Sequence, residues 1–187
     1  QRNNVHFFYT LPFAKNKALI ETTWISKLED NSLKDYESQI EKYIKNNLRI
    51  ENYKINYKEE GAIPLFRQAN HKEKNKINIG SAGGMTRLST GYTFMNIQDH
   101  SKYIRKNIEN IENIKKFEIN KKYHFLDKIF LKVLERYPEK MPSIFFKMFN
   151  GSSDAVIKFL SNKSNIFEDL LIILKMPKWI FIKALFK

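Results

Sequence analysis

The sequence predicts an α+β protein in which a strand-containing first half is followed by an all-helical second half. Segments 5–13 and 18–24 are rich in aromatic and β-branched residues and are separated by a short polar stretch, which is typical of a β-hairpin. Beyond Lys121 the apolar residues recur at helical spacing. With 187 residues, of which 42% are hydrophobic, the chain is large and apolar enough to bury a core.

Glu21 stands within the second predicted strand. Because successive side chains of a strand point to opposite faces, Glu21 shares its face with Leu19 and Thr23. The strand therefore gives this carboxylate an apolar setting. On the residues alone, the alternative is an edge-strand glutamate that faces water, since Glu is seldom buried.

The middle of the chain predicts three further elements. Residues 31–48 combine a capping-box spacing of Ser32 and Asp35 with an apolar stripe of 3.6-residue period, which indicates an amphipathic helix. Residues 52–61 alternate Tyr and Ile with polar residues, as a half-buried strand does. The short segment Lys76–Gly80 is predicted as one more strand.

The rest of the chain is predicted to be helical. Isoleucines recur at helical spacing from about Tyr92. A long helix after Lys121 is followed by three shorter ones, which are separated at Pro142, Gly151 and Pro177. We therefore divide the sequence into three parts: the sheet portion 1–75, the strand–loop–helix 76–120 and the helical region 121–187.

The net charge of +13 leaves three interpretations open. Lys, Asn and Ile are spread evenly along the chain, so solvated Lys-rich faces explain the charge most simply. Attraction to a membrane surface is the second explanation, and binding of nucleic acid is the third. We expect no nucleic-acid partner, because the aromatic residues follow core periodicity instead of alternating with Lys on an exposed face.

The absence of cysteine excludes disulfides, thiolate nucleophiles and zinc ribbons, and no metal site is predicted. The longest apolar stretch, 170–186, is interrupted by three lysines and a proline, and it falls short of the unbroken apolar length that spans a bilayer. The chain begins with Gln1 and shows no signal-peptide pattern, so it is predicted to be a piece of a longer protein.

Four of the six glycines lie in one stretch, GSAGGMTRLSTGY, from Gly80 to Tyr92. Glycine allows φ > 0 and lets a ligand approach the main chain closely. A strand, a glycine turn and a helix N-terminus together direct backbone N–H groups and the positive end of the helix dipole toward an anion or polar ligand. A purely structural turn, with glycines required for packing, is the alternative.

Five segments together resemble the FAD-dependent lycopene cyclases. Residues 79–94, IGSAGGMTRLSTGYTF, are similar to the flavin-contacting motif in the C-terminal part of that family. Residues 7–24, FFYTLPFAKNKALIETTW, are similar to its F-x-Y-x-L-P segment and the L-I-E-x-T that follows. EEGAIPL, FLSNKS and MPKWIFIKAL match further segments in family order, so the resemblance extends from about Val5 to Leu185.

The resemblance implies a p-hydroxybenzoate-hydroxylase-like FAD-binding flavoprotein, of which this chain is the C-terminal part: a portion of the substrate-domain β-sheet followed by an all-helical region. The glycine fingerprint that holds the FAD pyrophosphate in such proteins is missing from this sequence. We therefore expect an N-terminal half of the same protein to supply it, and the isolated fragment to be inactive without that half.

The resemblance also implies site residues. Glu21 falls on the family's strand acid, and Glu59 matches the acid of its E-x-x-G-like segment, where it either pairs with Glu21 or holds the loop. More distant relatives carry Asp where this sequence has Ser81. FAD is expected to contact eight residues of the glycine loop: Gly80, Ser81, Ala82, Gly83, Gly84, Thr90, Gly91 and Tyr92.

In this family an acid protonates a terminal double bond of linear lycopene, the cation closes to a six-membered ring, and a proton is lost. Reduced FAD is required although no electrons are transferred overall, and NAD(P)H serves only to reduce the flavin. The resemblance thus implies formation of β-ionone rings, from lycopene to γ- or β-carotene. Because protonation of an alkene needs a carboxyl that keeps its proton near neutral pH, the pKa of that acid must be raised.

The C-terminal stretch after Asp169 is basic and aromatic, and it carries no further acid. Such a helix lies in the headgroup region of a bilayer, from which a C40 hydrocarbon is delivered. We expect a cytoplasmic protein that associates peripherally with the inner face of the cell membrane. A core helix with lysines on its solvent face is the alternative. The residues concerned are Lys175, Lys178, Lys183, Lys187, Trp179, Phe181 and Phe186.

Two other classes of function stay open at this point. Another flavoenzyme of the same superfamily, a monooxygenase or an isoprenoid reductase, needs no alkene-protonating acid. A non-catalytic basic module that binds membranes needs no flavin loop.

Overall fold

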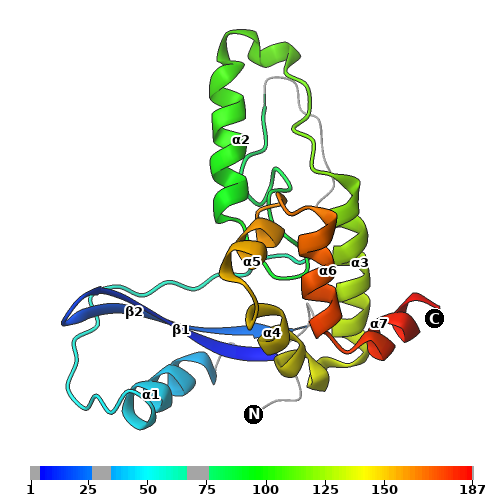
Figure 1. Ribbon diagram of the computed structural model, residues 1–187. Coiled ribbons are helices and arrows are strands. Elements are labelled where there is room, and N and C mark those ends of the chain that lie inside the picture. Colours follow the sequence, from blue (N-terminus) through cyan, green and yellow to red (C-terminus); the bar gives the residue numbers. More distant parts are fainter. Residues whose placement is uncertain (1–4, 27–34, 67–75, 187) are drawn as a thin grey trace. The chain divides into compact units, whose positions relative to one another are not determined.

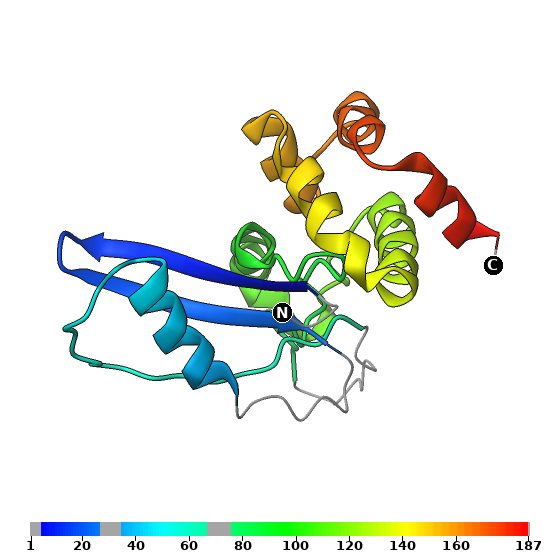
Figure 2. The same cartoon turned by 90° about the horizontal axis from the view of Figure 1, so that it is seen from below.

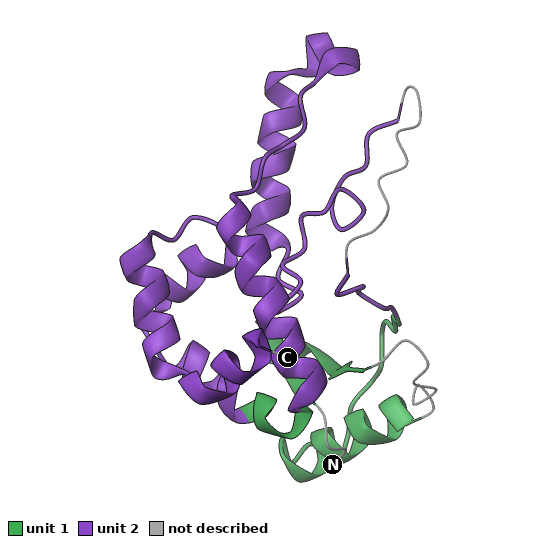
Figure 3. Cartoon of the chain, turned by 90° about the vertical axis from the view of Figure 1, so that its right-hand side faces the viewer, with its two compact units in different colours: residues 1–60, 138–142 green, residues 61–137, 143–187 purple. Residues whose placement is uncertain are grey.

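The computed structural model describes residues 5–26, 35–66 and 76–186, and the chain divides into two compact units (Figure 3). Unit 1 comprises residues 1–60 and 138–142, and unit 2 comprises residues 61–137 and 143–187. The predicted α+β class is confirmed, because the described residues contain one two-stranded antiparallel sheet and are otherwise mainly helical. The three-part division of the sequence and the flavoprotein fold stay predictions.

Unit 1 is built on the predicted β-hairpin, which is confirmed. Strand β1 (Val5–Ala14) pairs antiparallel with β2 (Lys17–Ile25), and the two strands lie side by side in both views (Figures 1 and 2). The register places Tyr9 opposite Glu21. It also places His6 opposite Trp24, and because strand side chains alternate, this second pair lies on the other face of the hairpin.

Helix α1 (Tyr36–Asn46) covers the face of the hairpin that carries His6 and Trp24. The Trp24 ring stacks on His6 at 3.8 Å and on Tyr36 at 4.6 Å between ring centroids. Phe8 stacks on Tyr43 at 4.2 Å. These aromatic stacks join helix to sheet, and they leave the Glu21 face on the opposite side of the hairpin from α1. The predicted capping residue Ser32 lies outside the described residues.

Two predicted strands are wrong. Residues 52–61 form no strand, because neither face of this segment is buried: Tyr53, Ile55 and Tyr57 are all exposed along with the residues between them. Lys76–Gly80 forms no strand either, because the carbonyls of Ile79 and Gly80 accept bonds from the turn that follows. Alternation alone cannot make a strand where the backbone has no partner.

Unit 2 is helical, as predicted. Helices α2 (Phe94–Lys106) and α3 (Lys121–Arg136) are its longest, and a short 3-10 helix, η2 (Ile108–Asn113), follows α2 (Figure 1). Another short 3-10 helix, η3 (Pro138–Lys140), belongs to unit 1 together with the first two residues of α4. Four more helices complete the chain: α4 (Met141–Phe149), α5 (Ser153–Leu160), α6 (Ile166–Lys175) and α7 (Lys178–Leu185).

The sequence predicts three short helices after α3, whereas the structure has four. Gly151 separates α4 from α5, and Pro177 precedes α7, as predicted. Pro142 does not separate two helices. It occupies the first turn of α4, where a proline is tolerated because its missing N–H has no partner within the helix. None of the helices in the described residues is long and apolar enough to cross a membrane.

We predict that Trp24→Ala lowers the free energy of unfolding by about 3 kcal/mol, because it removes a buried ring that is stacked on two others. Chemical denaturation followed by far-UV circular dichroism measures this change. Phe13→Ala is the matched control. Its ring lies on the same hairpin but is exposed, so the change stays within about 0.5 kcal/mol. Equal losses for the two variants contradict the prediction.

Candidate functional site

The face of the hairpin opposite to α1 holds Glu21 among apolar side chains. Tyr9 lies directly across from it on β1, and Phe7 and Leu11 flank Tyr9 on the same face. The rings of Phe7 and Tyr9 meet edge to face at 5.1 Å. Glu21 is half-buried here, whereas Tyr9 and Leu11 are exposed. The face is therefore an apolar surface that is open to a partner and carries one carboxyl group.

The environment of Glu21 favours its protonated form. Burial raises the pKa of Glu21 above its ordinary value, and the charge of Glu59 and a hydrogen bond between the two carboxyl groups raise it further. Burial and the charge of Glu21 also raise the pKa of Tyr9, so the phenol opposite Glu21 stays neutral. The structure thus brings together the two acids that the sequence analysis named.

Glu59 is held from two directions. The Tyr57 hydroxyl donates a hydrogen bond of 2.8 Å to Oε2 of Glu59. Lys58, which lies between Tyr57 and Glu59 in the sequence, forms a 2.8 Å ion pair with Glu37 of α1. Alternate residues of an extended segment point in opposite directions, so one side of this segment is anchored to α1 while the other presents Glu59 to Glu21. The side chains of this segment alternate in direction as in a strand, although the segment is not part of a sheet.

The first half of the glycine loop is a tight turn. The N–H of Met85 donates to the carbonyl of Gly80, and the N–H of Gly83 donates to Ile79 and Gly80. Gly80 and Gly84 have φ of +59° and +79°, which residues with a Cβ rarely adopt. A Cβ at Gly83 would lie 2.6 Å from a backbone oxygen. The turn itself therefore requires these three glycines, as the structural alternative proposed.

The second half of the loop is another turn, closed by a 2.8 Å bond from the Arg87 N–H to the Tyr92 carbonyl. Gly91 adopts φ of +75° within it. A chain of hydroxyls joins the two turns: Thr93 donates to Thr86 at 3.3 Å, and Thr86 donates to Ser81 at 3.0 Å. The loop is consequently one ordered structure from the first turn to the start of α2.

Arg87 anchors the loop in the helical region. Its side chain is buried and forms a 2.8 Å ion pair with Asp127 of α3, which also accepts bonds from the Ser89 hydroxyl and the Leu88 N–H. The guanidinium donates to the carbonyl of Phe159 on α5 as well. It lies over the Phe159 ring at 4.6 Å and over the Tyr123 ring at 4.9 Å.

Asn162 and Asn96 extend this network. Asn162 follows α5 and has φ of +60°. Its side-chain oxygen accepts from Arg87 at 3.2 Å, and its side-chain nitrogen donates to Asn96 of α2 at 3.0 Å. Asn96 is buried and donates in turn to the carbonyl of Met85 in the loop. Three helices are thus tied to the loop through side-chain hydrogen bonds.

No pattern in the sequence predicted Arg87, Asp127, Asn96 or Asn162 as members of this network. One signal was available in the sequence: Asp127 lies four residues after Tyr123 and three before Phe130, on the helical spacing of the side chains that α3 buries. A carboxylate on a buried stripe requires a cationic partner. The sequence alone does not say which cation that is.

The loop carries donors suited to an anionic or hydroxyl-rich group. Within the described residues, the N–H groups of Ser81 and Ala82 donate to no backbone carbonyl, and both residues are exposed. Thr93 precedes α2 but uses its hydroxyl on the loop and makes no capping bond to the helix. Exposed N–H groups beside a helix N-terminus bind phosphate and similar anions, so this donor set fits part of a nucleotide cofactor.

Comparison with known proteins adds one decisive match. A family model described as "Lycopene cyclase protein" matches residues 1–185. The chain belongs to the lycopene cyclase family. The resemblance noted from its motifs is thereby confirmed, and membership of the lycopene cyclase family indicates carotenoid cyclisation as the general activity. No curated protein and no solved structure matches the chain significantly.

We predict that Arg87→Met lowers the free energy of unfolding by about 3–5 kcal/mol, because it leaves the Asp127 carboxylate buried without its counter-charge. Equilibrium urea denaturation measures the loss. Arg87→Lys keeps the charge but loses the planar fork, so its loss is smaller. In the double variant with Asp127→Asn, part of the stability returns. An Arg87→Met protein as stable as the parent contradicts the prediction.

The raised pKa of Glu21 predicts how stability depends on pH. A carboxyl whose pKa is higher in the folded state favours folding while it is protonated, and this stabilisation is lost as pH rises from the ordinary Glu value of 4.5 through the folded pKa. Glu21→Gln is neutral at every pH. Its midpoint of thermal unfolding therefore exceeds that of the parent at pH 8 and equals it at pH 4. A less stable Glu21→Gln protein at pH 8 refutes this account.

Proposed function

We propose that the chain is the substrate-facing part of a lycopene β-cyclase, which converts the linear ends of lycopene to β-ionone rings, giving γ- or β-carotene. The observation that carries the proposal is a glutamate with a raised pKa on an open apolar face, in a chain that belongs to the lycopene cyclase family. An exposed apolar surface suits a hydrocarbon, and a protonated carboxyl suits its first chemical step.

In the proposed reaction Glu21 is the acid. Its proton is added to a terminal double bond, and the resulting substrate cation closes to a six-membered ring by reaction with a second double bond. A ring proton is then lost, which restores a double bond, so one proton is gained and one is lost and the reaction is an isomerisation. A carboxyl that is already ionised at neutral pH cannot donate the first proton, which is why the raised pKa is needed.

Glu59 is proposed as the partner that keeps the proton on Glu21. Two carboxyl groups in contact do not both ionise readily, so one of them retains a proton. Because burial, the charge of Glu59 and the hydrogen bond between the two groups all raise the pKa of Glu21, the proton of the pair is assigned to Glu21. Phe7 and Leu11 on the same face carry no nucleophilic group, and the raised pKa of Tyr9 keeps its phenol uncharged.

The glycine loop is proposed as part of the FAD site. Reduced FAD, once bound, provides an electron-rich ring that stabilises positive charge on the substrate, and NAD(P)H acts as its reductant. Exposed N–H groups of Ser81 and Ala82 and the start of α2 would hold polar parts of the cofactor, and the other members of the site would be Gly80, Gly83, Gly84, Thr90, Gly91 and Tyr92. An N-terminal half of the same protein would supply the rest of the nucleotide site.

The protein is proposed to be cytoplasmic and to associate peripherally with the inner face of the cell membrane, where lycopene is dissolved. The basic C-terminal segment supports this location, because Trp179 and Phe186 are exposed beside lysines. Phe181, in contrast, packs against Phe130 of α3. The second candidate function, a monooxygenase or isoprenoid reductase of the same superfamily, is not favoured by an acid with a raised pKa.

We predict that Glu21→Gln lowers cyclisation by about 10²-fold or more, because the amide cannot donate the initiating proton. The open reading frame that contains this chain is expressed in a lycopene-accumulating host, and cyclic carotenes are measured in the pigment extract. Glu41→Gln, on α1, is the control and keeps full activity. Cyclic carotene at the parental level from Glu21→Gln excludes Glu21 as the acid and favours the second candidate function.

A further inference from the structure

Helix α6 presents an apolar face to solvent. Five large side chains at positions i, i+1, i+4, i+5 and i+8 lie on one side of the helix and are strongly exposed, and we name this set the α6 face: Ile166 (70%), Phe167 (80%), Leu170 (45%), Leu171 (56%) and Leu174 (58%). On a helix that covers a soluble core, such residues face inward. Here Ile172 and Asp169 are buried instead.

The acidic residues of α6 are bound within the protein. Glu168 forms a capping box with Asn165 and a 2.8 Å ion pair with Lys158. Asp169 forms a 2.6 Å ion pair with Lys122. Both acidic side chains of α6 are therefore engaged at its inner surface and its N-terminus. Neither of them makes the α6 face polar.

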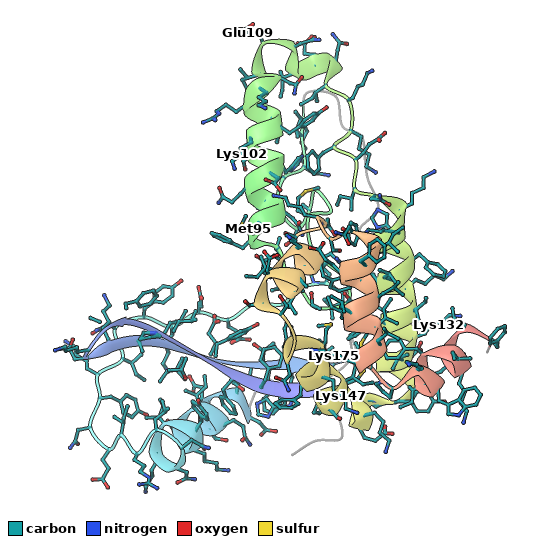
Figure 4. All side chains as sticks on the ribbon, in the orientation of Figure 1. Met95, Lys102, Glu109, Lys132, Lys147 and Lys175 are labelled. Atoms are coloured by element: carbon teal, nitrogen blue, oxygen red, sulfur yellow. The ribbon has the colours of Figure 1, made fainter. Side chains whose placement is uncertain are left out.

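Further exposed apolar side chains lie on the two helices next to the end of α6. Lys175 donates a 3.1 Å bond to the carbonyl of Asn150, which brings the end of α6 beside the end of α4; Figure 4 labels Lys175 together with Lys147 of α4. Phe146 and Phe149 on α4 are exposed. At the junction with α7 there is an open, mainly apolar hollow of ≈ 560 Å³ lined by Met176, Pro177, Lys178, Trp179 and Ile182. Exposed apolar side chains thus lie on α4, α6 and α7, and large exposed apolar patches mark interaction sites.

The charges around this surface are positive. Between residues 143 and 186 the chain has three acids, Asp154, Glu168 and Asp169, and each forms an ion pair with a lysine. In contrast, within the described part of the chain no acid forms an ion pair with any of four lysines on α4, α6 and α7: Lys147, Lys175, Lys178 and Lys183. An apolar face with a cationic surround matches an anionic lipid surface. A second copy would instead oppose like charges.

We infer that the α6 face inserts into the interfacial layer of an anionic bilayer, with the neighbouring lysines on lipid headgroups and the hollow beside Trp179 in contact with hydrocarbon chains. The inference rests on the membrane association proposed above and identifies α6 as the inserting element. Helix α7 is instead tied to the core, since Phe181 packs on Phe130 and Ala184 is fully buried.

Vesicle flotation tests this inference with Leu174→Glu and a matched control, Ile108→Glu. Both residues are 58% exposed, and both changes replace an aliphatic side chain with a carboxylate, but Ile108 lies in η2. With vesicles of phosphatidylglycerol and phosphatidylcholine, Leu174→Glu binds about tenfold more weakly or worse, because a leucine no longer enters the bilayer. Ile108→Glu binds as the parent does. Far-UV circular dichroism verifies that both variants are folded.

Three outcomes overturn the inference. In the first, Leu174→Glu floats as well as the parent. In the second, light scattering shows that the parent is a dimer, and Leu174→Glu becomes monomeric without losing vesicle binding, so a second copy covers the face. In the third, changing Lys175, Lys178 and Lys183 to Glu abolishes vesicle binding, whereas Leu174→Glu does not. The protein would then associate with the membrane through its lysines, as proposed above, without inserting the α6 face. Flotation measures membrane binding and requires no enzyme turnover. Each outcome can therefore be interpreted even if the chain does not catalyse cyclisation.

Discussion

The ion pair between Arg87 and Asp127 is the interaction on which the order of unit 2 depends. It joins a loop that contains no regular secondary structure to helix α3, and the same guanidinium reaches α5 through the Phe159 carbonyl. Both charges are buried, so each is stable only in the presence of the other. The loop that we propose for FAD therefore owes its shape to helices that are distant from it in the sequence.

A comparable dependence operates in unit 1. Glu21 acquires its raised pKa from partial burial and from Glu59, whose segment also carries the ion pair of Lys58 with Glu37 and the hydrogen bond from Tyr57 to Glu59. A residue with the chemistry of an acid thus depends on neighbours that have no part in the reaction. The two proposed parts of the site, the acid pair and the loop, belong to different units, and each is ordered by its own contacts.

The sequence predicted what local periodicity determines. The hairpin and the helices follow from spacing that is visible within a dozen residues, and the structure has them. Residues 52–61 and Lys76–Gly80 were mispredicted because strand formation requires a partner backbone, which a local pattern does not report. Arg87 and Asp127 were missed for the same reason: 40 positions separate them, and no spacing rule links a buried arginine to its carboxylate. Glu21 was noted as a carboxylate in an apolar strand and was assigned as the acid through a family resemblance, whereas its contact with Glu59 required the structure.

Asn162 illustrates how narrowly one position can be constrained. A left-handed backbone at the end of α5 admits glycine and asparagine readily, while bonds to Arg87 and Asn96 demand an acceptor and a donor on one short side chain. Glycine adopts the left-handed backbone but has no side chain to make the two hydrogen bonds. Glutamine has the donor and the acceptor but does not adopt this backbone readily. Asparagine meets both demands, so a substitution at position 162 disturbs either the backbone at the end of α5 or the hydrogen bonds that join the loop to α2, although the residue touches no reacting atom.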